Sequence, residues 1–340
     1  MDFAATAMVY LAASGFYWPF VAAATLLQTL SAVQAFKIAL LYYYLSYGGA
    51  PESRDGRPCW GLVRWWRKCH SFFPVNLHMA PELLQKFRTT FSDKDDPRAG
   101  TGTAVILAVH PHGPYPLGAS VMMPQLVCAD ACFTNARYAA ASAIFKVPLL
   151  RDLLLSLGCV DAGRSTLSAL LQKKRWVGIL PGGEREQLVC CDSDSQTEDL
   201  VAPRPGLFRL AVDHDAVIVP VFVFGERRAY TSSRCLLPFR TLLVKKYRVG
   251  LPIAYGQHRW FPFVPRRGAL DVVFGEPLGM PSELLAGCAG VPGGDEALLL
   301  FEAEYRSAVE SLFEAHKGRY GCAHKKIRWV AGPDETEKKA

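Results

Sequence analysis

The sequence predicts an α/β fold in which a mostly parallel β-sheet is flanked by helices, with a membrane-embedded helical hairpin at the N-terminus. Two observations predict this arrangement. From Thr103 onward, strand-like runs of β-branched and aliphatic residues alternate with helix-like stretches, the order typical of a parallel sheet covered by helices. In the N-terminal part of the chain, no charged residue occurs between Phe3 and Phe36. Such an uncharged run exceeds the roughly 20 residues that one membrane-spanning helix needs.

The N-terminal apolar segment has room for one tilted helix or two shorter ones, and Pro19 favours a hairpin over residues 1–47. Basic side chains follow the segment and place the rest of the chain on the cytosolic side. A secretory signal peptide is disfavoured because the leading segment is acidic, the apolar run is too long and no clear cleavage site follows it. We therefore expect the hairpin, a membrane-associated α/β domain at residues 48–330 and a polar tail at residues 331–340.

Composition excludes several classes of protein. A hydrophobic content of 50% with 20% charged residues excludes wholesale disorder. The net charge of +7 comes from scattered basic residues without a nucleic-acid-binding motif, so anionic lipid headgroups or a phosphorylated cosubstrate are the expected partners. The ten cysteines include no C-x-x-C pair, which predicts neither a zinc site nor a disulfide framework and indicates a reducing compartment.

Individual elements follow from the hydrophobic pattern. Strands are predicted at Thr103–Val109, Trp176–Leu180, Val217–Phe224 and Leu270–Phe274. Helices are predicted at Leu117–Val127, Leu149–Leu157, Thr166–Lys174 and Leu207–Asp213. A last helix is capped by Asp295 and stops at Gly318, and its apolar face, which includes Tyr305, is assigned to the core without a functional role. Surface loops are expected at Cys191–Asp199 and Gly287–Gly294.

Residues suited to catalysis follow two of the predicted strands. His110 and His112 follow the first, where an imidazole is accessible and titrates near neutral pH. A Pro-Gly-Gly turn with Glu184 and Glu186 follows the second. Because parallel strands share one carboxyl edge, the two loops are expected to meet there, where a carboxylate would raise the basicity of an imidazole and fix its tautomer. Taken singly, each motif is more often an ordinary polar turn.

Ordered motifs over nearly the whole chain resemble the type-2 diacylglycerol acyltransferase family, which includes monoacylglycerol and wax-alcohol acyltransferases. The motifs are Trp65-Trp66, Phe72-Phe-Pro74, His110-Pro-His-Gly113, Pro181-Gly-Gly-x-x-Glu186, Arg204-x-Gly-x-x-Arg209, Val219-Pro-Val-x-x-Phe-Gly225, Val272-Val-Phe-Gly-Glu-Pro277 and Glu314-x-His-Lys317. The resemblance implies a glycerolipid-acyltransferase-like fold and an acyl-CoA-dependent transferase of neutral lipid in the endoplasmic reticulum membrane, also acting at lipid droplets. It implies acyl-CoA as a cosubstrate and no permanently bound cofactor. A homo-oligomer is compatible with it.

The chemistry of this family requires a base for the acceptor hydroxyl, and we assign His112 to it. His110 supports the turn or binds substrate, and the sequence leaves open which histidine is the base. No acid follows the histidines closely, so Glu186 is the expected orienting group. Further candidates are backbone amides of Gly113, Gly182 and Gly183 for the oxyanion, and Arg164, Arg204 and Arg209 for the phosphates of coenzyme A. For each arginine, a structural or surface role is the alternative.

The expected reaction is esterification of diacylglycerol to triacylglycerol. Monoacylglycerol or a long-chain alcohol is the alternative acceptor, because the same base serves every hydroxyl. A noncatalytic lipid-binding homologue and a His-x-His metal-dependent hydrolase are weaker alternatives, the latter because no further cluster of ligands completes a metal site. The segment Leu236–Pro265 mixes apolar, aromatic and basic residues, and is either a membrane-interface segment that admits the acceptor or an ordinary packing segment.

Overall fold

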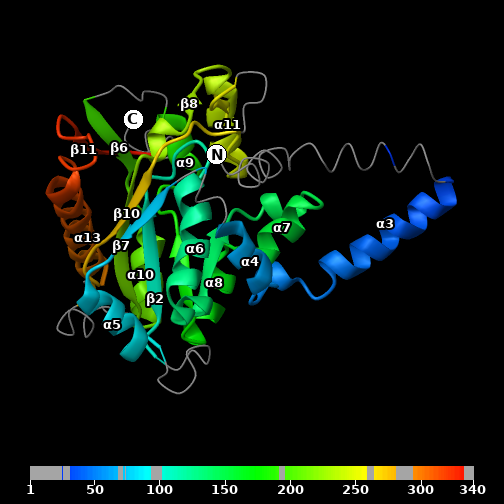
Figure 1. The fold of residues 1–340 in the computed structure, drawn as a ribbon, viewed down its shortest axis with the longest axis horizontal. Coiled ribbons are helices and arrows are strands. Elements are labelled where there is room, and N and C mark those ends of the chain that lie inside the picture. Colours follow the sequence, from blue (N-terminus) through cyan, green and yellow to red (C-terminus); the bar gives the residue numbers. More distant parts are fainter. Residues whose placement is uncertain are drawn as a thin grey trace.

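The computed structural model describes residues 31–67, 74–92, 102–190, 196–258, 264–280 and 294–332, with Thr25 and Phe72. Its centre is a seven-stranded sheet, parallel except for one antiparallel pair, β10 with β7 (Figure 1). In spatial order the strands are β1 (Val75–His78), β10 (Leu270–Phe274), β7 (Val217–Phe224), β2 (Val105–His110), β5 (Trp176–Ile179), β3 (Ala136–Ala140) and β4 (Cys159–Asp161). The predicted α/β fold with a mostly parallel sheet is confirmed.

Helices cover both faces of the sheet, and a further helix extends away from it (Figure 1). The helices are α3 (Ala32–Tyr47), α4 (Trp60–Trp66), α5 (Pro81–Thr89), α6 (Leu117–Ala129), α7 (Leu150–Ser156), α8 (Arg164–Gln172), α9 (Gly183–Val189), α10 (Pro205–Asp213), α11 (Leu237–Tyr247) and α13 (Gly294–His316). Short 3₁₀ turns lie at Pro51–Ser53, Ala131–Asn135, Ile144–Lys146 and Glu226–Arg228, the last being η6. Two small sheets pair β6 (Thr197–Val201) with β11 (Lys326–Val330), and β8 (Thr231–Ser232) with β9 (Ala254–Tyr255).

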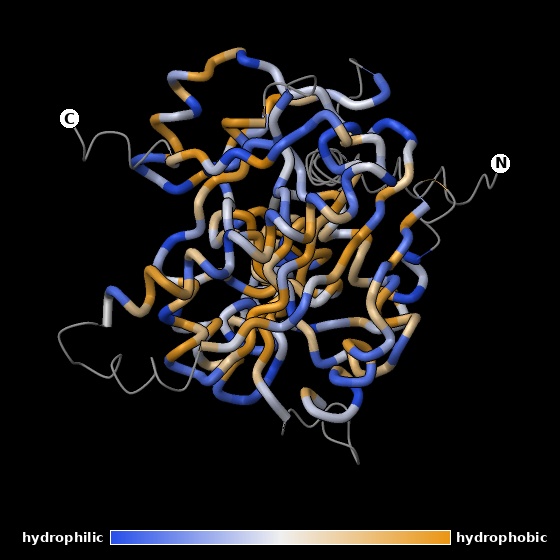
Figure 2. The backbone as a smooth tube through the Cα atoms, turned by 90° about the vertical axis from the view of Figure 1, so that its left-hand side faces the viewer, coloured by the Kyte–Doolittle hydropathy of each residue, from blue (hydrophilic) through white to orange (hydrophobic). Residues whose placement is uncertain are grey.

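The core is divided in two by the central strand β2. Val105, Leu107 and Val109 point to the face covered by α4, α5 and α6. Ile106 and Ala108 point to the face covered by α8, α10 and α13. All six residues of β2 are buried, because a central parallel strand is packed on both of its faces. Figure 2 shows the resulting band of hydrophobic residues through the middle of the molecule.

Differences from the predicted elements are local. The strand β6 begins inside the predicted loop Cys191–Asp199, at Thr197, because β11 pairs with it from a distant part of the sequence. Residues 191–195, and residues 281–293 of the second predicted loop, lie outside the described part. The last helix begins at Gly294, one residue before its predicted cap, and ends at His316, two before Gly318.

The predicted membrane hairpin falls mostly outside the described residues, which exclude 1–24 and 26–30. Its described part is the helix α3, a single segment of 16 residues. At a rise of about 1.5 Å per residue, such a helix is shorter than the roughly 30 Å hydrocarbon core of a bilayer. Within the described parts of the chain, no helix has the combined length and apolar character that crossing a membrane requires. A spanning hairpin is therefore not supported by the described residues.

Candidate active site

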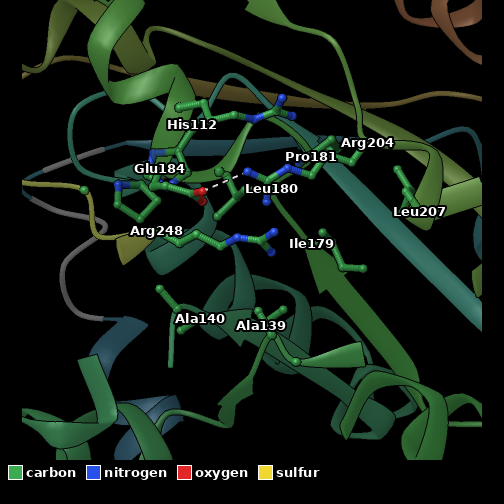
Figure 3. Close-up of a pocket in the computed structure, with 18 of the residues that line it drawn as sticks. His112, Ala139, Ala140, Ile179, Leu180, Pro181, Glu184, Arg204, Leu207 and Arg248 are labelled. Atoms are coloured by element: carbon green, nitrogen blue, oxygen red, sulfur yellow. Dashed lines mark hydrogen bonds and ion pairs between the residues drawn. The ribbon is translucent and has the colours of Figure 1, made fainter. Parts of the chain in front are cut away.

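A cavity of about 510 Å³ opens at the carboxyl edge of the sheet, beside the ends of β2, β3 and β5. His112, the turn that precedes α9, and the starts of α8 and α10 line it, together with residues 248–250 after α11 (Figure 3). The parallel register places these loops together, since β2 pairs with β5 on one side and with β7 on the other. The predicted meeting of the histidine loop with the Pro-Gly-Gly loop is confirmed.

His112 lines the cavity in a defined orientation. Its Nδ1 lies 2.8 Å from the carbonyl oxygen of Gly113, and because a carbonyl only accepts, Nδ1 carries the proton and donates it. The neutral ring therefore has its lone pair on Nε2. Burial lowers the pKa of His112 below 6.5, while the hydrogen bond to Gly113 and the charge of Glu184 act in the opposite direction. The ring is thus neutral, and able to take up a proton, at physiological pH.

His110 has a different environment. Its side chain is fully buried, and its Nε2 shares a hydrogen bond of 2.8 Å with the hydroxyl of Tyr305 on α13. Burial lowers the pKa of His110 to about 3, so the ring stays neutral. It does not line the cavity. Of its two expected roles, this position fits support of the turn. The apolar pattern of α13 predicts that Tyr305 lies in the core, and that pattern alone does not show that its hydroxyl contacts a histidine.

Glu186 contacts the backbone of the histidine loop and not a ring. Its Oε1 accepts a hydrogen bond of 2.9 Å from the main-chain N–H of His112, and its side chain is fully buried. Burial raises the pKa of Glu186 to about 7, against the lowering effects of that hydrogen bond and of Arg227. The expectation that Glu186 orients the imidazole is wrong in its atomic detail, because the Gly113 carbonyl fixes the ring and Glu186 fixes its main chain.

Glu184 lies in the cavity and forms an ion pair with Arg204, Oε1 to Nη2, of 3.1 Å (Figure 3). Arg164, Arg185 and Arg248 also line the cavity, so arginines outnumber the single glutamate of its lining. Arg248 follows α11 in a left-handed conformation at φ 53° and extends into the cavity (Figure 3). In the sequence only the basic character of Arg248 is visible, and Arg248 is not among the residues predicted to bind phosphate.

The other predicted cosubstrate residues differ in their positions. Arg164 lines the cavity but is exposed and paired with Asp213 at 2.8 Å. Arg209 is exposed on α10 and is not part of the cavity lining. Gly182 and Gly183 both line it. The N–H of Gly183 donates to the Leu180 carbonyl oxygen at 3.0 Å and is therefore engaged in the turn.

Glycine is required at position 182, because a Cβ there would lie 1.7 Å from Oε2 of Glu186. Glycine at position 113 has φ +64°, a conformation that residues with a side chain rarely adopt. The missing side chain at Gly182 thus leaves room for the carboxylate of Glu186, and the missing side chain at Gly113 leaves room for that of Glu226.

Glu226, in η6 at the end of β7, is a second buried carboxyl group beside the histidine loop. Its two oxygens accept hydrogen bonds from the N–H groups of Leu117 and Gly118, at 2.9 and 2.6 Å, at the start of α6. Its Oε1 also lies 3.0 Å from the place of a Cβ on Gly113. Burial raises the pKa of Glu226 to about 8. Glu226 therefore ties β7 to the segment that follows His112. In the sequence, the feature that points to Glu226 is its position just after the apolar run that forms β7.

Within the described residues, no cluster of three or more histidine, cysteine, aspartate or glutamate side chains is arranged to hold a metal ion. The described cysteines are free thiols.

Comparison with known proteins identifies the family. Residues 28–328 match the family model described as diacylglycerol acyltransferase. The chain is 25% identical to Diacylglycerol O-acyltransferase 1 of Eremothecium gossypii over 82% of this chain and 59% of that protein, so it spans less than two thirds of that relative. It is 29% identical to mouse Acyl-CoA wax alcohol acyltransferase 1 over 81% of this chain and 80% of that protein. Human Diacylglycerol O-acyltransferase 2 is 24% identical over 90% of this chain and 77% of its own length.

A solved structure, the 1-acyl-sn-glycerophosphate acyltransferase PlsC of Thermotoga maritima, aligns with 90% of this chain and 93% of its own, at a TM-score of 0.42 and 13% identity. The family match covers most of the chain and agrees with the motifs gathered around the cavity. The chain belongs to the diacylglycerol acyltransferase family.

Proposed function

We propose that this protein transfers the acyl group of acyl-CoA to the free hydroxyl of diacylglycerol, with His112 as the general base. The observation that carries the proposal is the orientation of His112 at a basic cavity. The Gly113 carbonyl holds the proton on Nδ1, which leaves Nε2 as the site that accepts a proton. An alcohol attacks a thioester slowly without such a base, and proton removal by a positioned imidazole contributes typically 10²–10⁴-fold to the rate.

The reaction then proceeds in balanced steps. Nε2 of His112 accepts the hydroxyl proton as the alcohol oxygen attacks the thioester carbonyl carbon. The oxyanion of the tetrahedral intermediate is stabilised by main-chain N–H groups of the glycine loops, Gly113 and Gly182 being the candidates. As the C–S bond breaks, the imidazolium returns its proton to the departing sulfur, which yields the ester and free coenzyme A. No acyl-enzyme is formed. The charge of Glu184 raises the basicity of the ring within the buried site.

The arginines of the cavity are assigned to the phosphates of coenzyme A. Guanidinium groups bind phosphate oxygens bidentately, which suits Arg204 and Arg248 of the cavity lining. In the structure Arg204 is paired with Glu184, so a phosphate that binds Arg204 competes with that carboxylate and frees it to act on His112 alone. Arg164 is exposed and is a weaker candidate for binding phosphate, because its guanidinium already forms an ion pair with Asp213.

We place the protein at the endoplasmic reticulum membrane, with residues 1–47 embedded, most of the chain on the cytosolic side and lipid droplets as a second location. Support comes from the uncharged N-terminal run and from α3, whose apolar residues are exposed along its length. Extraction of membranes with alkaline carbonate should leave the protein in the pellet. Release of the full-length chain into the supernatant would contradict the embedded segment.

The acceptor is tested by incubating purified protein with labelled acyl-CoA and diacylglycerol, monoacylglycerol or a long-chain alcohol in turn. We expect triacylglycerol as the main product, and restored lipid droplets when the chain is expressed in cells that lack triacylglycerol synthesis. Wax ester as the main product would assign the protein to the long-chain alcohol reaction instead, for which the mouse wax alcohol acyltransferase is the relevant relative. Absence of any ester, in folded protein, would favour the noncatalytic lipid-binding alternative.

A further inference from the structure

The outer face of α11 is an exposed apolar surface next to the cavity. It is formed by five large side chains from α11 and its flanks, each between 40% and 59% exposed. They are Leu236, Phe239, Leu242, Tyr247 and Leu251. We call this set the α11 surface. Within α11 the spacing of Phe239, Leu242 and Lys246 places them along one side of the helix, while Arg240 and Val244 are buried on the other. A soluble protein gains nothing from such a surface unless a partner covers it.

The charge around the α11 surface identifies that partner. No aspartate or glutamate occurs between Arg227 and Leu270. Arg234, Lys246 and Arg248 are exposed beside the apolar side chains. Apolar and aromatic residues flanked by basic ones are typical of a helix that lies in the headgroup region of a membrane, where the cations meet anionic lipids. A protein partner would need an acidic, apolar patch of matching shape.

The α11 surface is held rigidly over the cavity. Arg240 is fully buried and donates hydrogen bonds from Nε to the Leu251 carbonyl, 2.8 Å, and from Nη1 to the Ser233 carbonyl, 2.7 Å. These bonds join the segments before and after the helix. A Cβ on Gly250 would lie 2.2 Å from Oε1 of Gln187, which shows how closely this segment packs on α9. α9 also carries Glu184 and Glu186.

The same segment forms part of the cavity wall. Arg248, Val249 and Gly250 follow α11 directly and line the cavity that contains His112. The apolar surface therefore ends beside the cavity wall. The α11 surface is separate from α3, a different helix that extends away from the α/β domain (Figure 1).

We propose that the α11 surface lies in the headgroup region of an anionic membrane and admits the lipid acceptor from it into the cavity. This inference rests on the proposed acyltransferase function. It distinguishes two membrane contacts, an N-terminal segment that holds the chain and a second surface that orients the active site towards its substrate.

The test places a benzophenone photo-crosslinking amino acid at position 239 of the full-length chain, reconstituted in vesicles of phosphatidylcholine and phosphatidylserine. Position 299 is the matched control, because Leu299, like Phe239, is a large apolar residue that is at least half exposed, but it lies on α13. We expect irradiation to join phospholipid to position 239 and not to position 299. Crosslinks from position 239 to a second copy of the chain, or to the chain's own N-terminal segment, would overturn the proposal, as would equal lipid labelling at both positions.

Activity separates this inference from the proposed function. The double variant Phe239→Ser with Leu242→Ser should lose about tenfold in activity on diacylglycerol dissolved in vesicles, since two apolar side chains no longer enter the membrane. Neither residue lines the cavity, so activity on a water-soluble short-chain diacylglycerol should be unchanged. Loss on both acceptors would overturn the surface's role in admitting lipid. If the unaltered protein is inactive on both acceptors, the proposed function fails, and the crosslinking result still decides the membrane contact.

Discussion

The main-chain N–H of His112 donates a hydrogen bond to Oε1 of Glu186 over 2.9 Å, while the ring of the same histidine donates to the Gly113 carbonyl. The two ends of the residue are thus held by two different groups. Because the main chain and the ring are both fixed, Nε2 is kept in one position relative to the cavity. An active site that relies on a general base depends on such positioning as much as on the pKa of the base.

This relationship predicts the effect of changing Glu186. Glu186→Gln keeps an oxygen that accepts the His112 N–H, but it puts an NH2 group in place of the buried Oε2, which has no hydrogen-bond partner among the described residues. We expect kcat to fall by about tenfold and the unfolding midpoint to fall slightly, because the buried NH2 group has no acceptor there. The measurement is steady-state acyl transfer with thermal unfolding of the same preparation. A loss as large as that of His112→Ala would mean that Glu186 takes part in proton transfer itself.

The pH dependence of activity follows from the lowered pKa of His112. The base works in its neutral form, so activity should fall as the ring becomes protonated, below pH 6.5. Glu184→Gln removes a negative charge that raises this pKa, so the fall should move to lower pH. The profile of kcat/KM between pH 5 and 8 measures both effects. An acid limb that is centred above 6.5, or one that Glu184→Gln moves upward, would contradict this assignment.

Gly182 tests the close packing of the two loops. Gly182→Ala places a methyl group 1.7 Å from Oε2 of Glu186, so the loop must move. We expect a loss of roughly 1–3 kcal/mol in the free energy of unfolding. Gly61→Ala, in α4, is the control, because nothing lies within 4 Å of the added methyl group. That substitution should stabilise the protein by about 0.5–1 kcal/mol, since alanine favours a helix. Equal effects of the two substitutions, measured by denaturant unfolding, would show that the turn is not constrained.

Much of the fold can be predicted from the sequence, and each strand that was not predicted has a physical reason. β7 and β10 match their predicted residues at both ends, because each is a mainly apolar run between turn residues, with Asp271 as the one charged residue of β10. β3 and β4 were not predicted, since Ala136–Ala140 and Cys159–Asp161 are short and weakly apolar and become strands through their neighbours. The first three residues of β6 were predicted as part of a loop, because its partner β11 joins it from more than a hundred residues away.

The candidate site shows the same division. The sequence located the loops of His112 and Glu186 at one edge, because the rule for parallel strands is independent of side-chain detail. It did not show that Glu186 binds a main-chain N–H, nor that Tyr305 reaches His110, because such contacts depend on rotamers and helix packing. Arg248 was missed because its place in the cavity depends on the turn that ends α11.

The arginines of the cavity separate binding from catalysis. Arg204→Ala and Arg248→Ala should each raise KM for acyl-CoA by about tenfold with little change in kcat, because a phosphate contact made in both ground and transition states acts mainly on binding. Arg209→Ala is the control: Arg209 lies on α10 like its neighbours at the cavity but does not line it. Its KM should match that of the unaltered protein. A raised KM in Arg209→Ala alone would move the phosphate site to the outer side of α10.

The most direct test of the account is acyl transfer by His112→Ala in folded, membrane-inserted protein. We predict a fall in kcat by a factor of about 10² to 10⁴, as expected for the loss of a general base, with an unfolding midpoint close to that of the unaltered protein. His110→Ala, measured in parallel, should act mainly on stability, because His110 is fully buried and bonded to Tyr305. Near-normal turnover by His112→Ala would contradict the account.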